Sequence, residues 1–147
     1  MKLGLSIAYA GGFRDAVSAL PNYVNAGIDT VAVSEVYSFD AVSQLGYLAG
    51  RFPEIELLSA VLQMYPRTPA LTAMTAAGLD AVCGGRFTLG LGTSGPQVVE
   101  GFHGLAFDSP VARTREVIEI CRTVWRREPL EYSGRLYRVP LPVGEGL

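Results

Sequence analysis

Four segments that favour β-strands alternate with four that favour helices along this chain. The strand-like segments begin near residues 2, 30, 55 and 86, and a helical apolar pattern follows each of them. This spacing is close to the roughly 31 residues per unit of a ~250-residue barrel of eight β-strand and α-helix units. Crossovers between such units are right-handed and produce parallel sheets. The pattern predicts an α/β fold of the (β/α)8 TIM-barrel type, of which this chain supplies about the first four units.

The expected helices have recognisable starting residues. Asp40 can cap the second helix, and Thr68 and Ser109, each followed by proline, predict the starts of the third and fourth. The fourth helix should reach about residue 127, with Glu116 among the charged residues of its solvent-facing side. Residues 131–139 then predict a small β-hairpin. An open four-stranded sheet is the alternative to half a barrel.

Composition limits the functions that this chain can have. Its 147 residues favour a single domain, here a partial barrel over residues 1–147. The net charge of −2 without a basic cluster makes nucleic acid and anionic membranes poor partners. The longest apolar runs are too short to span a bilayer. Cys83 and Cys121 are far apart and predict buried free thiols in a reducing compartment. Because the first strand begins at Lys2, we expect no signal peptide and a cytoplasmic protein.

A glycine-rich turn follows the fourth expected strand, residues 87–91. The stretch from Arg86 to Gly104 reads RFTLGLGTSGPQVVEGFHG, and it places Thr93 and Ser94 between closely spaced glycines. Glycine allows the backbone to turn sharply and to approach a ligand closely. Parallel α/β folds bind ligands where a strand passes into such a turn. The same glycines also occur where a tight turn after a strand simply requires them.

The motif GLGTSGPQVVEGFHG resembles that of the bacterial luciferase-like flavin and deazaflavin oxidoreductases. It is closest to the branch that uses the deazaflavin coenzyme F-420. The segments KLGLSIAY, TVAVSEVY, LLSAVLQMYPRTPALTAM and RTREVIEICRTVWRREPLEYSGRLYRVP are also similar to that family. The resemblance covers essentially the whole chain, as the N-terminal half of a longer barrel. It implies hydride transfer between a deazaflavin and a small organic substrate.

The resemblance also implies which residues hold the cofactor, since the family binds the tricyclic ring at the C-terminal mouth of the barrel. It implies a non-prolyl cis peptide bond between Ala60 and Val61, which would support one face of the ring. The acidic residue at the end of the second strand, Glu35, would contact the ring. The turn after the fourth strand would contribute backbone and hydroxyl contacts from Gly92, Thr93, Ser94 and Gly95.

Two departures from the family pattern affect the expected chemistry. Relatives of the glucose-6-phosphate dehydrogenase type have a catalytic histidine where this chain has Val36, which cannot transfer a proton. The motif often has tryptophan where this chain has Phe102. The phosphate tail of the cofactor is usually held by the C-terminal half of the barrel. A complete cofactor site therefore needs more than these residues.

Several residues have alternative interpretations. Glu35 is either a ring contact, a solvated carboxylate or the ion-pair partner of Arg67. His103, the single histidine, is a candidate for proton transfer, although a loop histidine more often serves as a hydrogen-bonding surface residue. Tyr9, at the end of the first strand, is a candidate substrate contact. The residues do not decide among these alternatives.

Three hypotheses of function follow. The first is an oxidoreductase that depends on coenzyme F-420, and the second is a luciferase-like monooxygenase that depends on FMN. The third belongs to another class: a non-catalytic half-barrel, or a truncated assembly subunit without activity. Because an unclosed sheet edge invites association, we expect self-association or a C-terminal half-barrel as partner.

Overall fold

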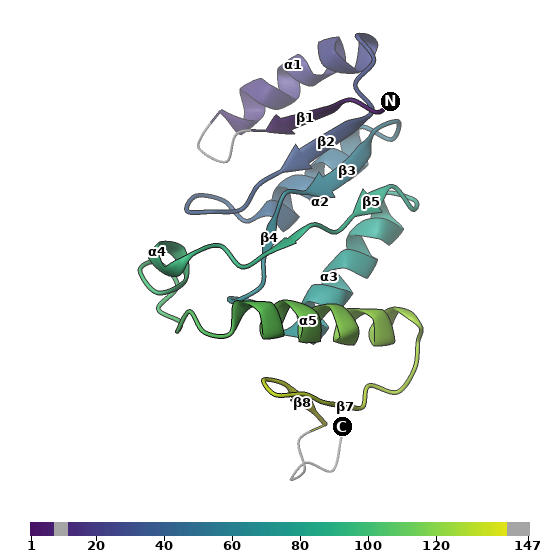
Figure 1. Cartoon of the computed structure of the whole chain (residues 1–147). Coiled ribbons are helices and arrows are strands. Elements are labelled where there is room, and N and C mark those ends of the chain that lie inside the picture. The colour runs from purple at the N-terminus through teal and green to yellow at the C-terminus, as the bar shows by residue number, and fades with distance from the viewer. Residues whose placement is uncertain (8–11, 141–147) are drawn as a thin grey trace.

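The computed structural model describes residues 1–7 and 12–140. A parallel four-stranded sheet forms its centre, in the spatial order β1-β2-β3-β5 (Figure 1). These strands are β1 (Gly4–Ile7), β2 (Thr30–Val33), β3 (Glu56–Ser59) and β5 (Phe87–Thr88). The parallel pairing and the predicted order are confirmed, because each strand lies beside the next one that the βα alternation supplies.

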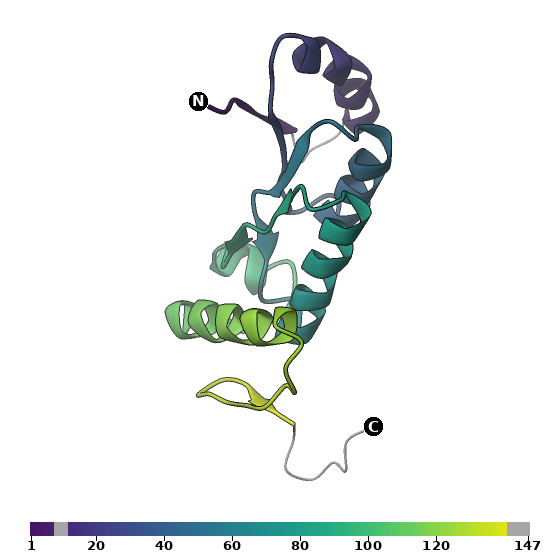
Figure 2. The same ribbon diagram turned by 90° about the vertical axis from the view of Figure 1, so that its right-hand side faces the viewer.

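Three helices cover one face of this sheet. Figure 2 shows α1, α2 and α3 together on that face, whereas α5 crosses below the sheet. The helices are α1 (Phe13–Asn25), α2 (Ala41–Arg51), α3 (Pro69–Val82), the short α4 (Pro96–Val99) and α5 (Pro110–Trp125). Val31, Val33 and Leu57 point into this helix-covered side and are at most 1% exposed. The main apolar core therefore lies between the sheet and its outer helices.

The opposite face of the sheet is only partly covered. Ser6, Ala32 and Leu58 are in register on this face, and none of them is fully buried. The third expected strand is almost continuously apolar after Glu56, and this pattern predicts a strand that is covered on both faces. Within the described residues this prediction is wrong, because the chain supplies outer helices but no elements to face Leu58 across the sheet.

The third and fourth predicted strands are each divided into two. The third continues after β3 as β4 (Leu62–Gln63), and the fourth continues after β5 as β6 (Leu91–Gly92). β4 and β6 pair in parallel as a separate two-stranded ladder. The second strand ends at Val33, so Glu35 lies in the loop that follows it. The interruptions bend both strands at the carboxyl edge of the sheet.

Two of the three predicted helix caps are confirmed. Asp40 accepts a hydrogen bond from the Ser43 N–H at 2.9 Å, and Thr68 Oγ1 accepts one from the Leu71 N–H at 3.2 Å. The prediction that the Ser109 side chain caps α5 is wrong. Ser109 has a left-handed backbone with φ 46°, and its hydroxyl accepts no bond from the first turn. Its carbonyl oxygen instead accepts the Arg113 N–H at 2.9 Å.

Replacing Asp40 by alanine is expected to lower the free energy of unfolding by about 1 kcal/mol at neutral pH. Burial raises the pKa of Asp40. The hydrogen bonds from Ser43 and the nearby charge of Arg67 together lower it by a larger amount, so the net pKa lies below its usual value. The stabilisation is therefore present above the usual pKa and is lost as the pH falls through the lowered one. Urea unfolding checks this, with Asp15→Ala as a first-turn control. Equal losses in the two variants would contradict it.

The predicted hairpin forms from β7 (Tyr132–Ser133) and β8 (Arg138–Val139), and it folds back onto α5. Its turn is held by Glu116, which is 6% exposed. The carboxylate accepts backbone N–H bonds from Arg135, Leu136 and Tyr137 at 2.8–3.2 Å. The prediction that Glu116 faces solvent is therefore wrong, because the returning hairpin covers that side of the helix.

Both cysteines are buried and free, as predicted. Burial raises the pKa of the Cys121 thiol to about 11, so it stays protonated at neutral pH. Among the described residues, no helix combines the length and apolar character needed to cross a bilayer.

Candidate functional site

The strand bends bring two backbone segments together at the carboxyl edge of the sheet. The Ser59 hydroxyl and the Gly90 backbone exchange hydrogen bonds, each at 2.9 Å. The Leu62 N–H donates to the Gly90 carbonyl at 2.8 Å. A Cβ atom at Gly90 would overlap the Ser59 carbonyl oxygen. Glycine at this position therefore allows the close approach of the two strands, rather than a special backbone angle.

Replacing Gly90 by alanine is expected to lower the free energy of unfolding by about 1–3 kcal/mol, because the obstructing atom belongs to the backbone and cannot rotate away. Gly78→Ala in α3 is the matched control. Nothing lies within 4 Å of its added methyl group, so it should stabilise the chain by about 1 kcal/mol. Chemical denaturation of both variants provides the comparison. A Gly90→Ala protein as stable as the parent would contradict the close approach.

The peptide bond between Ala60 and Val61 is cis, as the resemblance implied. Both polar backbone groups of Ala60 are committed within the protein. Its N–H donates to the Val33 carbonyl at 2.7 Å, and its carbonyl accepts the Ser34 hydroxyl at 2.8 Å. These bonds tie the loop after β2 to the bend between β3 and β4. The Ala60 N–H is therefore not free to donate to a ligand, and the exposed Val61 gives this segment an apolar surface.

The turn after β6 lies against this bend. A Cβ atom at Gly92 would overlap the side chain of Val61, a residue that is 38% exposed. Ser94 has a left-handed backbone with φ 55°. In the part of the chain that the structure describes, the backbone N–H groups of Thr93, Ser94 and Gly95 donate to no other group. An apolar surface beside free N–H donors suits a flat ring with carbonyl groups at its edge. We call Ala60, Val61 and residues 92–95 the strand-end site.

Glu35 takes part in a hydrogen-bonded network next to the strand-end site. Its carboxylate accepts from Arg67 Nη2 at 2.7 Å, from the Gln63 N–H at 3.0 Å and from the Ala41 N–H at 3.2 Å. The Glu35 and Arg67 side chains are only 10% and 17% exposed. The interpretation of Glu35 as the partner of Arg67 is therefore confirmed, and that of a solvated carboxylate is wrong. Its contact with a ring stays a prediction.

A pocket of about 260 Å³ opens between the loops after β2, after β4 and after α4. Glu35 and His103 both line it, and none of Ala60, Val61 and residues 92–95 does. We call this cavity the Glu35 pocket. The predicted site residues are thus divided between the strand-end site and the Glu35 pocket. Of the proposed ring contacts, Glu35 is the one that lines the Glu35 pocket. Tyr9 lies outside the described residues.

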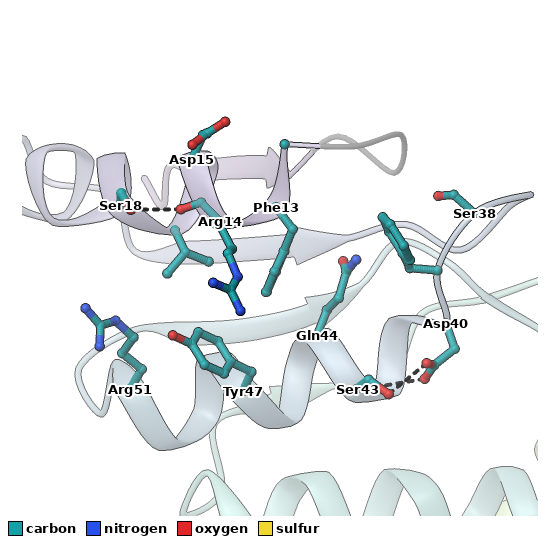
Figure 3. Close-up of a pocket in the computed structure, with 13 residues that line it drawn as sticks. Phe13, Arg14, Asp15, Ser18, Ser38, Asp40, Ser43, Gln44, Tyr47 and Arg51 are labelled. Carbon is teal, nitrogen blue, oxygen red and sulfur yellow. Dashed lines mark hydrogen bonds between the residues drawn. The ribbon is translucent and has the colours of Figure 1, made fainter.

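A larger groove of about 1150 Å³ lies between α1 and α2 (Figure 3). Phe13 and Arg14 face Gln44 and Tyr47 across it, and Asp40 closes one end through its bonds to Ser43. None of the described candidate residues lines this groove. It separates two outer helices and does not adjoin the strand-end site.

Gln63 is a contributor to the site that the sequence pattern missed, whereas Arg67 was already proposed as an ion-pair partner of Glu35. The polar residues that follow the third expected strand, Gln63 and Arg67 among them, predict a polar loop. Gln63 instead belongs to β4 and is 2% exposed, and its amide donates to the carbonyls of Glu35 and Val36 at 3.2 and 3.1 Å. The loop prediction is therefore wrong for Gln63. The sequence did contain a signal for this network. An acidic residue follows the second strand, and a glutamine and an arginine follow the third.

The fold and the site together define a class of protein. A parallel βα array whose strands end beside an apolar surface and unpaired N–H groups has the architecture of the first half of an α/β barrel. A family model described as luciferase-like monooxygenase matches residues 3–146. The chain belongs to this family.

Curated relatives agree with this membership. A Mycobacterium tuberculosis protein assigned by name to the coenzyme F-420-dependent oxidoreductases is 44% identical over 149 residues. The match covers 99% of this chain and 43% of that protein. A 5,10-methylenetetrahydromethanopterin reductase of Archaeoglobus fulgidus is 30% identical over 78% of this chain and 34% of its own. The chain therefore spans less than half the length of these relatives.

Solved structures show the same fold. The F-420-dependent tetrahydromethanopterin reductase of Methanopyrus kandleri superposes with a TM-score of 0.82 at 21% identity, covering 94% of this chain and 44% of that one. The oxygenating constituent of 3,6-diketocamphane monooxygenase from Pseudomonas putida, in complex with FMN, gives a TM-score of 0.76 at 22% identity. That superposition covers 95% of this chain and 44% of that one. The prediction of a partial TIM barrel is confirmed.

Proposed function

We propose that this chain forms the N-terminal half of the cofactor site of an oxidoreductase that transfers hydride between coenzyme F-420 and a small organic substrate. The observation that carries the proposal is the strand-end site, where exposed Val61 lies beside the free N–H groups of residues 93–95. The 44% identity to a relative named for coenzyme F-420 favours the deazaflavin.

Each part of the strand-end site has a distinct task in this proposal. The bound deazaflavin supplies the carbon that accepts or donates the hydride. Ala60 and Val61 support one face of the ring and leave the other face for substrate. The N–H groups of residues 93–95 stabilise negative charge at the ring edge. Val36 cannot transfer a proton, so His103 is the candidate proton donor among the described residues, and Glu35 is proposed to contact the ring.

The second candidate is an FMN-dependent monooxygenase, because a solved structure of the same fold contains FMN. Both cofactors have a tricyclic ring with a carbonyl-bearing edge, so the strand-end site suits either. Fluorescence or absorbance titrations with each cofactor test the choice. We expect tighter binding of coenzyme F-420 than of FMN. Tighter binding of FMN would overturn the choice of cofactor, and binding of neither would favour a non-catalytic half-barrel.

We further propose that a partner covers the open face of the sheet, either a C-terminal half-barrel or a second copy of this chain. Ala32 and Leu58 are partly exposed, and among the described residues no strand pairs with the outer edges of β1 and β5. Both observations support this proposal. Size-exclusion chromatography with light scattering tests it. For the isolated chain we expect a discrete dimer. A monodisperse, cooperatively folded monomer would contradict the proposal.

A further inference from the structure

Gln63 is a buried polar residue that binds the loop after β2. It belongs to β4 and is 2% exposed. Its side-chain amide donates to the carbonyls of Glu35 and Val36 at 3.2 and 3.1 Å, and its backbone N–H donates to Glu35 Oε2 at 3.0 Å. A primary amide has two N–H donors, which match these two carbonyls. Gln63 therefore holds Glu35 by its backbone and by its carboxylate.

The strand that carries Gln63 also holds the turn of the strand-end site. Gln63 is in register with Gly92 in the parallel pair of β4 and β6. The Met64 N–H donates to the Gly92 carbonyl at 3.1 Å. The turn with the free N–H groups of residues 93–95 begins directly after Gly92. Gln63 thus joins the loop that carries Glu35 to the turn that is proposed to meet the ring edge.

The loop after β2 is attached on both sides of Val61. Before it in the chain, the Ala60 carbonyl accepts the Ser34 hydroxyl at 2.8 Å. After it, Gln63 binds the loop through the three hydrogen bonds given above. Two attachments fix the loop more firmly against the bend than one of them would. They set the position of the Glu35 carboxylate relative to the exposed Val61.

We propose that Gln63 is a positioning residue of the cofactor site, which fixes where the Glu35 carboxylate lies relative to Val61 and the turn after β6. This role rests on the proposed function, in which Glu35 contacts the ring. Arg67 and the Ala41 N–H also bind this carboxylate, but Gln63 in addition holds the backbone of the loop. A residue that is 2% exposed acts through Glu35 rather than by contact with the ring.

The variant Gln63→Met keeps the size of the side chain and removes both amide donors. The Glu35 carboxylate should then move, so hydrogen exchange of the Ala41 N–H, which it accepts, should become about tenfold faster. Thr72→Val is the matched control, because Thr72 is 1% exposed and its hydroxyl donates to another backbone carbonyl, that of Thr68. It should leave the exchange at Ala41 unchanged. The same exchange rate at Ala41 in Gln63→Met as in the parent would overturn the proposal.

Titration of the ¹⁵N-labelled full chain with coenzyme F-420 separates positioning from stability. In the parent we expect shifts at residues 93–95 and at Glu35. Gln63→Met should bind about tenfold more weakly and lose the Glu35 shift, while the shifts of residues 93–95 remain. Thr72→Val should bind like the parent. Equal affinity with an unchanged Glu35 shift in Gln63→Met would contradict the positioning role.

Failure of the cofactor site is seen separately from failure of this role. A parent chain without shifts at residues 93–95 would contradict the cofactor site, and the exchange rate at Ala41 would still decide whether Gln63 positions Glu35. If circular dichroism shows that Gln63→Met does not fold, Gln63→Glu serves in both measurements. It keeps the size of the side chain and replaces the two donors by a carboxylate that only accepts.

Discussion

Replacing Glu35 by alanine is expected to lower the free energy of unfolding by about 3–5 kcal/mol, because it leaves Arg67 largely buried without its counter-charge. The variant also removes the acceptor of the Ala41 and Gln63 N–H groups. These contacts join the loop after β2 to α2 and to β4. A loss of this size is a large share of the 5–15 kcal/mol that typically separates folded from unfolded chains.

Urea unfolding followed by circular dichroism measures this loss. Glu54→Ala is the matched control, since Glu54 is exposed and should change stability by less than about 0.5 kcal/mol. The loss of stability in Glu35→Gln should lie between the losses in Glu54→Ala and Glu35→Ala, because glutamine keeps the size of the side chain but removes the charge opposite Arg67. A Glu35→Ala protein that matches Glu54→Ala would show that the carboxylate does not hold these loops together.

Replacing Glu116 by alanine should lower the free energy of unfolding by about 3 kcal/mol or more. The change removes the acceptor of the N–H groups of Arg135, Leu136 and Tyr137, each of which costs about 1–3 kcal/mol if it stays buried and unpaired. The hairpin should then separate from α5. Faster hydrogen exchange in residues 132–139 would show this, and exchange as slow as in the parent chain would contradict it.

The same carboxylate predicts a dependence on pH. Burial raises the pKa of Glu116. The backbone hydrogen bonds that it accepts together lower the pKa by a larger amount, so the folded-state pKa lies below the usual 4.5. The stabilisation is present above that value and is lost as the pH falls through the lowered folded-state pKa. The parent chain should therefore lose more stability on acidification than Glu116→Ala does. Glu131→Ala, on an exposed residue, should behave like the parent.

Local sequence patterns were sufficient for most of the fold. The alternation of apolar strands and helices predicted the parallel order, and Asp40 and Thr68 marked the helix starts that the structure shows. These features depend on residues close to one another in the chain. The cis bond between Ala60 and Val61 came instead from the family resemblance, since no residue type in that segment requires it.

The local sequence pattern could not predict contacts between segments that are distant in the chain. Glu116 has the spacing of a solvent-facing residue, and a hairpin about 20 residues later buries it. Gln63 looks like a loop residue until the loop after β2 supplies two carbonyl acceptors for its amide. Ser109 precedes a proline like a capping residue, but its left-handed backbone prevents the capping bond. In each case a tertiary contact or a backbone angle outweighed the local preference.

The most direct test of the proposed cofactor site is residue-resolved NMR of the ¹⁵N-labelled chain titrated with coenzyme F-420. We expect the largest shifts at the amide signals of Gly92, Thr93, Ser94 and Gly95, with smaller ones at Val61 and Glu35. Shifts confined to other surfaces, or none at saturating cofactor, would contradict the assignment of the strand-end site to the ring.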